Sequence, residues 1–229
     1  MLAYPETATS TSAGIIVLVP RIAEGRSVNA NWDTLGMRAT RSDALILEEC
    51  WIPEARSSFS LMTSDHFGML MRIGFGARIR PFTWGWRPPR ITKCYVMHAR
   101  QPQGYAQSLG YHPDVRRHVA KMSVDLEAAR LITYHSAWLS DTQGPTPETT
   151  AALYRAKYVV GEAVSRITRT ALTLGGAHGI FKGSRLEQLF RDGALAPLQP
   201  PPADFCLWNM SIFELGLDPI DMLPPLRPI

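Results

Sequence analysis

Two long helical patterns, joined by a Gly-Pro turn, constrain the fold of this 229-residue chain more than any other feature. The first begins at His112-Pro113-Asp114, where a first-turn proline and a neighbouring acid both favour a helix start. After the break at Gly144-Pro145, the second begins at Thr146-Pro147-Glu148 and ends at Gly175-Gly176. In the first pattern the apolar residues recur every three or four positions and form one stripe: Val115, Val119, Met122, Leu126, Ala129 and Ile132. Long helices joined by short turns predict an antiparallel bundle.

Two shorter helices are predicted after this pair. One follows Ser184 and carries Leu186, Leu189 and Phe190 on one face. The prolines at 197 and 200–202 then exclude helix, and a last amphipathic segment runs from about Asp204 to Leu215.

The N-terminal part reads as sheet. A β-branched run at residues 15–19 ends at Pro20, and a second strand pattern at residues 45–52 ends at Pro53. Because two strands do not make a stable sheet, we expect most of their partners to be missing or to belong to another chain. The sequence thus predicts an α+β fold that is mainly α, with a partial β-domain at residues 1–60 and an antiparallel four-helix-bundle domain at residues 61–229.

Cysteine spacing and hydropathy bound the setting of the protein. Cys50, Cys94 and Cys206 lie far apart with no CxxC pair, which argues against a zinc site and favours a reduced, cytoplasmic compartment. The longest apolar run, residues 14–20, is too short to span a bilayer, and the N-terminus lacks the pattern of a signal peptide.

Four segments, taken in order, resemble motifs of one family. They are Trp32–Arg38 (WDTLGMR) with Ser42-Asp43 and a strand ending in Ile-Pro-Glu; Arg100–Gly104 (RQPQG), similar to Arg-x-x-Phe-Gly; Ala171–Gly179 (ALTLGGAHG), similar to Gln-x-x-Gly-Gly-x-Gly; and Leu186–Asp192 (LEQLFRD), similar to Glu-Arg-x-x-Arg-Asp. Gln103, Leu172 and Gln188 depart from these motifs. In order and spacing, the chain resembles the C-terminal part of an acyl-CoA dehydrogenase.

The resemblance implies a cofactor and a partner. In that family a helical domain, a β-domain and a four-helix bundle follow in order, and FAD lies between them and across a subunit interface. This chain would begin inside the β-domain, so we expect a truncated protein that needs a homo- or hetero-oligomeric partner to complete the FAD site. The implied activity is FAD-dependent oxidation of the CH–CH bond of an acyl thioester in lipid metabolism.

The resemblance also implies cofactor-binding residues: Arg100, Gly104, Gly175, Gly176 and Gly179. A guanidinium can grip a pyrophosphate with two hydrogen bonds, and glycines let a cofactor approach the backbone. Two plainer interpretations stand beside this one. A Gly-Gly pair after a long helix is commonly only a helix cap, and a single arginine is commonly a solvated surface group.

No catalytic residue is predicted. The family reaction needs a carboxylate base, which many members place nine residues beyond the Arg-Asp pair; that position is Pro200 here. Other members place it in the first bundle helix, but residues 66–113 hold no acid. We interpret Asp204 as a helix N-cap and expect no catalytic role for His178. The alternatives are a dehydrogenase-like flavin monooxygenase, a non-catalytic partner subunit, or a gene remnant.

One segment does not fit the family pattern. Residues 66–113 hold seven of the 24 basic residues and none of the 20 acidic ones, and residues 76–93 (GARIRPFTWGWRPPRITK) replace an expected apolar helix. Basic and aromatic residues together are typical of nucleic-acid binding, and a partner-binding loop is a second interpretation. We favour a third, a local frameshift, because a one-base shift of permissible codons across residues 81–90 restores an apolar helical sequence.

Overall fold

A computed structural model gives the fold. It describes residues 19–53, residue 104 and residues 106–217, together with the backbone of the short strands β1 (Leu2–Ala3), β2 (Ile15–Val17) and β5 (Ser57–Phe59). The predictions for Arg100 and for the basic segment at residues 76–93 fall outside the described residues. The predicted domain boundary near residue 60 remains a prediction.

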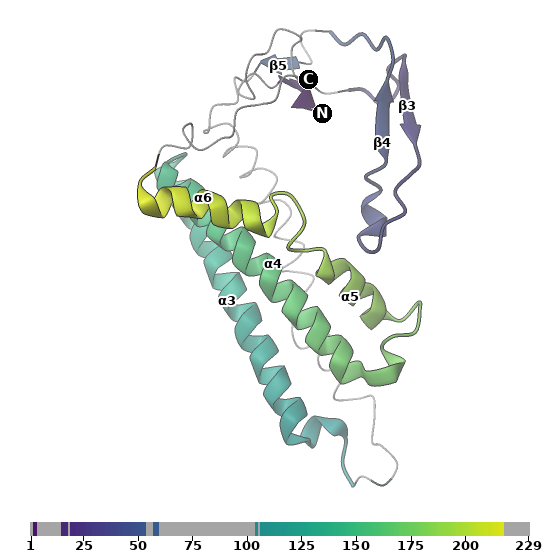
Figure 1. Ribbon diagram of the computed structural model, residues 1–229, viewed down its shortest axis with the longest axis vertical. Helices are drawn as coiled ribbons and strands as arrows, with labels where there is room; N and C mark the ends of the chain where they lie inside the picture. Colours follow the sequence, from purple (N-terminus) through teal and green to yellow (C-terminus); the bar gives the residue numbers. More distant parts are fainter. Residues whose placement is uncertain are drawn as a thin grey trace.

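The bundle is built on two long antiparallel helices, α3 (Pro113–Gln143) and α4 (Pro147–Gly175), which lie side by side in Figure 1. The predicted helix starts are confirmed. The His112 side chain accepts from the backbone N–H of Asp114, and Thr146 and Thr149 form a reciprocal capping box. The predicted stripe of α3 faces α4, where the two helices share a core made of Met122, Leu126, Ala129, Val160, Ala163, Val164 and Ile167.

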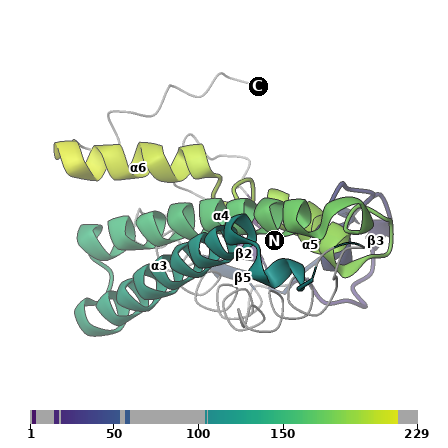
Figure 2. The same ribbon diagram turned by 90° about the horizontal axis from the view of Figure 1, so that it is seen from below.

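Two shorter helices, α5 (Arg185–Ala194) and α6 (Ala203–Leu215), complete the described bundle. Both pack on α4, and Figure 2 shows α6 and α3 on opposite sides of it. Ser184 caps α5 as predicted. The interpretation of Asp204 as an N-cap is wrong, because the N-cap is Pro202, two residues earlier, and Asp204 lies in the first turn of α6. There its negative charge still favours the positive end of the helix.

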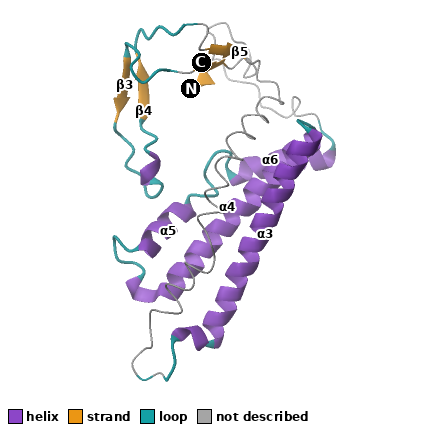
Figure 3. Ribbon diagram, turned by 180° about the vertical axis from the view of Figure 1, so that it is seen from behind, coloured by secondary structure: helices purple, strands orange, loops and turns teal. Residues whose placement is uncertain are grey.

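The strands form two small antiparallel sheets (Figure 3). In one, β2 lies between β1 and β5; in the other, β3 (Arg26–Asn29) pairs with β4 (Ala44–Leu47). Both predicted strands find partners within this chain. The expectation that most of their partners are missing or belong to another chain stays a prediction. The predicted strand at 45–52 is also shorter than expected, since Glu49 adopts a φ of 49° that a β-strand does not accommodate.

Together these elements confirm the predicted fold class, α+β and mainly α with an antiparallel helical bundle. Short 3-10 turns link them: η2 (Arg38–Thr40) after β3, η5 (Leu109–Tyr111) before α3 and η6 (Gly176–His178) after α4. Among the helices in the described part of the chain, none combines the length and apolarity needed to cross a membrane.

Candidate functional site

The predicted glycine motif forms the turn between α4 and α5. Gly176 has a φ of 57°, and a Cβ added to it would meet nothing within 4 Å. Its neighbours differ. A Cβ on Gly175 would lie 2.5 Å from Cδ1 of Leu186, and a Cβ on Gly179 would lie 3.3 Å from Cδ1 of Leu172. Packing against Leu186 and Leu172 therefore favours a residue without a side chain at Gly175 and Gly179, whereas the backbone of Gly176 faces open space.

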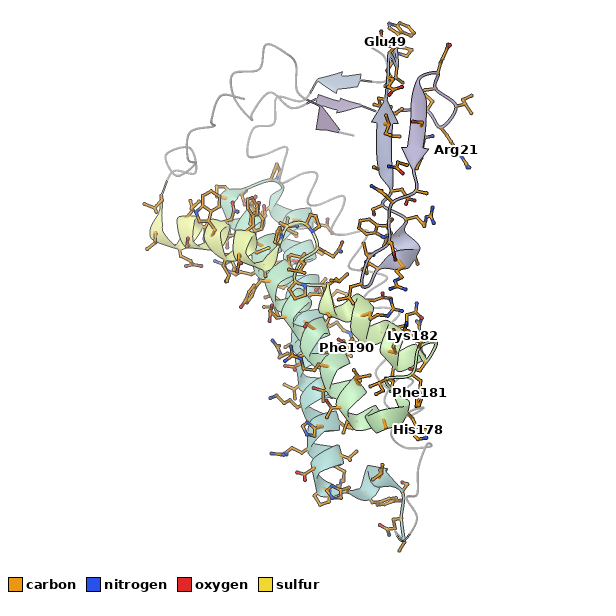
Figure 4. All side chains as sticks on the ribbon, turned by 45° about the vertical axis from the view of Figure 1, so that its right-hand side comes forward. Arg21, Glu49, His178, Phe181, Lys182 and Phe190 are labelled. Carbon is orange, nitrogen blue, oxygen red and sulfur yellow. The ribbon has the colours of Figure 1, made fainter. Side chains whose placement is uncertain are left out.

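The side chains after this turn point outward. Ile180 and Phe181 are 63% and 67% exposed, and the His178 ring meets the Phe181 ring edge-on with 6.4 Å between centroids. Figure 4 shows His178, Phe181 and Lys182 together on this loop, far from Arg21 and Glu49 at the outer end of the β3–β4 hairpin. We call residues 176–182 the glycine turn. It presents an open backbone, two apolar side chains and a lysine on one surface.

Gly104 lies just before the bundle along the chain. It is exposed, adopts a φ of 92°, and has open space around it. It precedes η5 and the start of α3, while the glycine turn follows the end of α4. Because α3 and α4 are antiparallel, the start of α3 and the end of α4 lie toward the same end of the bundle (Figure 1).

A second arrangement joins the N-terminal part to the bundle. The Met37 N–H donates to Oδ1 of Asp192 at 2.7 Å, and Nη1 of Arg191 donates to the Leu35 carbonyl at 2.9 Å. Gly36, between them, is buried, and a Cβ on it would lie 2.2 Å from the Arg191 carbonyl oxygen. We call this contact of residues 35–37 with Arg191 and Asp192 the junction. Here two backbones touch, and only glycine fits.

The loop that carries residues 35–37 is held by its own hydrogen bonds. Nε1 of Trp32 donates to the Met37 carbonyl, and its backbone N–H donates to Oδ1 of Asp43. Oγ1 of Thr34 donates to the Gly36 carbonyl. The motif Trp32–Arg38 and Asp43, which carried the family resemblance, therefore builds one face of the junction.

The other face is held by an ion pair within α5. Arg191 donates to the Glu187 carboxylate one turn earlier, and the backbone N–H of Glu187 donates to Oγ of Ser184, the N-cap. The hydrogen bond from Arg191 is the main reason that the pKa of Glu187 is lowered. The same hydrogen bond raises the pKa of Arg191. Arg191 is thus fixed as a cation whose guanidinium reaches Leu35.

The position expected for the base holds a proline, and the carboxylates near it are either exposed or already hydrogen-bonded. Pro200 is exposed in the loop before α6, and Asp204 is exposed in the first turn of α6. Glu187 and Asp192 are both engaged at the junction. Across residues 19–53 and 106–217, His, Cys, Asp and Glu side chains do not gather into a group that could hold a metal ion.

Sequence reasoning did not identify the junction. Its two faces are separated by 155 positions along the chain, so no local pattern joins them. The available signal was indirect: Gly36 and Asp192 each belong to a segment that carries the family resemblance, but neither was a predicted site residue.

Residues 89–197 match the family described as "Acyl-CoA dehydrogenase, C-terminal domain". The chain is 25% identical over 189 residues to the short-chain specific acyl-CoA dehydrogenase of Rattus norvegicus, covering 79% of this chain and 43% of that protein. It is 27% identical over 187 residues to cyclohexane-1-carbonyl-CoA dehydrogenase of Geobacter metallireducens, covering 79% and 47%. The chain thus spans about half the length of the curated relatives that it matches.

Solved structures give the same fold. Butyryl-CoA dehydrogenase from Megasphaera elsdenii superposes with a TM-score of 0.76 at 17% identity, over 93% of this chain and 55% of that one. The prolyl acyl carrier protein oxidase AnaB superposes with a TM-score of 0.77 at 20% identity, over 95% and 56%. The family match identifies residues 89–197 as an acyl-CoA dehydrogenase C-terminal domain, and the relatives and the shared fold extend the similarity to acyl-CoA dehydrogenases over most of the chain.

Proposed function

We propose that this chain forms part of a cytoplasmic FAD-dependent oxidoreductase that oxidises the CH–CH bond of an acyl thioester in lipid metabolism. One observation carries the proposal: the alignment with an acyl-CoA dehydrogenase runs for 189 residues and covers 79% of the chain. A likeness confined to the helices would support only a shared bundle. FAD, when bound, would accept the hydride.

The glycine turn fits the proposed cofactor. FAD carries an anionic pyrophosphate and flat rings, which need a close backbone approach, a cation and apolar surface. Gly176 offers open backbone, Lys182 a cation and Phe181 an exposed ring. We propose that these residues, with Gly104, Gly175 and Gly179, form the cofactor contact of the bundle. Arg100 belongs to the same proposal by its motif.

A second polypeptide would complete the site. The glycine turn exposes Ile180 and Phe181 on an outer surface rather than lining a cavity within the described chain. A flavin held there by this chain alone would keep one side in water. We therefore propose that another copy of this chain or a different subunit covers the opposite side.

Flavin binding tests the proposal directly. Purified protein, alone and mixed with the products of neighbouring genes, is titrated with FAD and followed by flavin absorbance and fluorescence. We expect a saturable complex, and Lys182→Ala and Phe181→Ala should weaken it by roughly tenfold, as for a lost charged hydrogen bond or aromatic contact. Arg21→Ala on the distant hairpin is the matched control. A protein that takes up no FAD under any of these conditions rules the proposal out.

A non-catalytic partner subunit is the second candidate. It is favoured by the exposed Pro200 at the expected position of the base and by the engagement of Glu187 and Asp192 at the junction. Such a subunit would bind FAD at the shared site but would add no base. Assays with acyl-CoAs of increasing chain length and a dye acceptor separate the two candidates, because only the first predicts turnover.

A further inference from the structure

The junction is a specific contact between two parts of the chain and not an incidental approach of two surfaces. Among residues 19–53 and 106–217, the hydrogen bonds that connect the N-terminal part to the bundle are the two that flank Gly36. They come from consecutive residues of α5 and reach a carbonyl and an N–H two residues apart. Such a two-point backbone contact fixes orientation as well as distance.

The backbone at the junction is held in an unusual conformation. Met37 adopts a φ of 58° and a ψ of 26°, the left-handed region that non-glycine residues seldom occupy. Its N–H donates to Asp192 and its carbonyl accepts from Trp32 and Thr40. A conformation of this kind persists only where its surroundings specify it. The carboxylate of Asp192 is the one group from the bundle that binds this residue in the described structure.

We propose that Asp192 and Gly36 are a positioning pair that sets the placement of the N-terminal part on the bundle, and through it the affinity of the flavin site. The second half of this statement rests on the proposed function. Gly36 allows the backbones to meet, and Asp192 selects one orientation of the loop through a charge-assisted hydrogen bond. Arg191, held by Glu187, supplies the second point of attachment.

The mechanism is steric and electrostatic at once. Without the carboxylate, the Met37 N–H loses its acceptor from the bundle, and its left-handed conformation loses one of its supports. With a Cβ on Gly36, the loop must move away from the Arg191 carbonyl, and both hydrogen bonds lengthen. Neither change touches the α3–α4 core, so the helices remain folded while the N-terminal part shifts. A cofactor that contacts both parts would then lose its fit.

Two readouts on three variants test the proposal. Asp192→Asn keeps an oxygen acceptor, Asp192→Ala removes it, and Asp141→Ala removes an exposed carboxylate of α3 as the matched control. Hydrogen exchange of peptides covering residues 31–43 reports the junction without any cofactor, and FAD titration reports the flavin site. For Asp192→Ala we expect exchange about tenfold faster and FAD binding about tenfold weaker, with α3 and α4 peptides unchanged. Asp192→Asn should restore most of both, and Asp141→Ala should change neither.

The outcomes separate this proposal from the proposed function. Unchanged exchange in Asp192→Ala overturns the positioning role. Faster exchange with unaltered FAD binding overturns its link to the flavin. If the wild-type protein binds no FAD, the proposed function fails together with that link, while the exchange data still decide whether Asp192 positions the loop. Gly36→Ala is a further variant, and the two Asp192 variants keep the test decisive if it does not fold.

Discussion

At the scale of single residues, the contact between α4 and α6 holds two buried ionisable side chains, one basic and one acidic. Lys157 is buried, and its Nζ donates to the Ala196 carbonyl at 3.0 Å. Cys206 is fully buried, and its thiol approaches the Pro201 carbonyl at 3.7 Å. Burial lowers the pKa of Lys157 and raises the pKa of Cys206 to about 11, so both groups resist carrying charge in the folded state.

The first prediction concerns the reactivity of Cys206. Because the thiolate is the reactive form, a buried thiol with a raised pKa should react slowly with iodoacetamide at pH 8 until the protein unfolds. Cys50 is partly exposed and should be modified first. Peptide mapping by mass spectrometry, with and without denaturant, measures both sites. Equal labelling of the two cysteines in the folded protein would contradict the burial of Cys206.

The second prediction concerns stability in alkali. Between the folded and unfolded pKa values of Lys157, the unfolded chain binds more protons, so Lys157 makes stability rise with pH in the range below about 10.5. Cys206 acts in the opposite direction. Its folded form keeps the proton longer, so its contribution is complete below pH 9 and is lost as pH rises toward 11.

Two variants separate these contributions. Urea unfolding between pH 7 and 11 should show a steeper alkaline loss of stability for Lys157→Met than for the wild type, since only the cysteine effect remains. Cys206→Ala should show a shallower loss. If both variants changed the slope of stability against pH in the same direction, the opposite effects assigned to Lys157 and Cys206 would be refuted.

At the scale of helices, the approach of α5 to α4 depends on one glycine. A Cβ on Gly193 would lie 2.5 Å from both Cγ2 and Oγ1 of Thr168, which is almost fully buried on α4. We predict that Gly193→Ala lowers the free energy of unfolding by about 1–3 kcal/mol through overpacking. Denaturant unfolding measures the change.

A double variant provides the control for this prediction. Thr168→Ala removes the two nearest atoms that a new Cβ would meet and leaves only the Thr168 Cβ at 3.0 Å, so Gly193→Ala should cost less in that background. Equal costs in the two backgrounds would show that contact with the Thr168 side chain is not what alanine disturbs at position 193.

The helices could be predicted well because the residues that begin and end them lie at the helix ends themselves. Pro113, the Thr146-Pro147 pair and Ser184 each lie at the end that they specify, and Gly175-Gly176 ends α4. Where the limit was not local, prediction failed. The start of α6 was assigned to an acid, although Pro202 takes that place, and the end of β4 is set by a positive φ at Glu49 that no composition rule indicates.

The candidate site was likewise predictable only where its residues lie close together in the sequence. The glycine motif of residues 175–179 was predicted, yet its three glycines differ in their surroundings: Gly176 faces open space, whereas Gly175 and Gly179 pack against Leu186 and Leu172. The junction needed the tertiary fold, because Gly36 and Asp192 meet only after α5 has packed on α4. Sequence patterns gave the parts of the site, and long-range packing determines which of them touch.

At the scale of the whole molecule, α4 is the one described helix that packs against α3, α5 and α6. Its buried residues lie on several sides, among them Ala151, Tyr154, Ala156, Lys157 and Val160. The outer face of α3, in contrast, leaves Val124, Leu131 and Trp138 between 58% and 70% exposed. We therefore predict that amide protons in the middle of α4 exchange slowest, at the rate of global unfolding, and that those of α6 exchange earlier. Native-state hydrogen exchange measures this order, and faster exchange in α4 than in α6 would contradict it.

The central place of α4 also bears on how the protein can evolve. A helix that meets three neighbours has few positions at which a new side chain enters only water, so most substitutions there must be matched by a change elsewhere. In a saturation library selected for folded protein, the tolerated variation should therefore be narrow along nearly every turn of α4 and broad on the outer side of α3, and lineages should exchange residues on α4 mainly in compensating pairs.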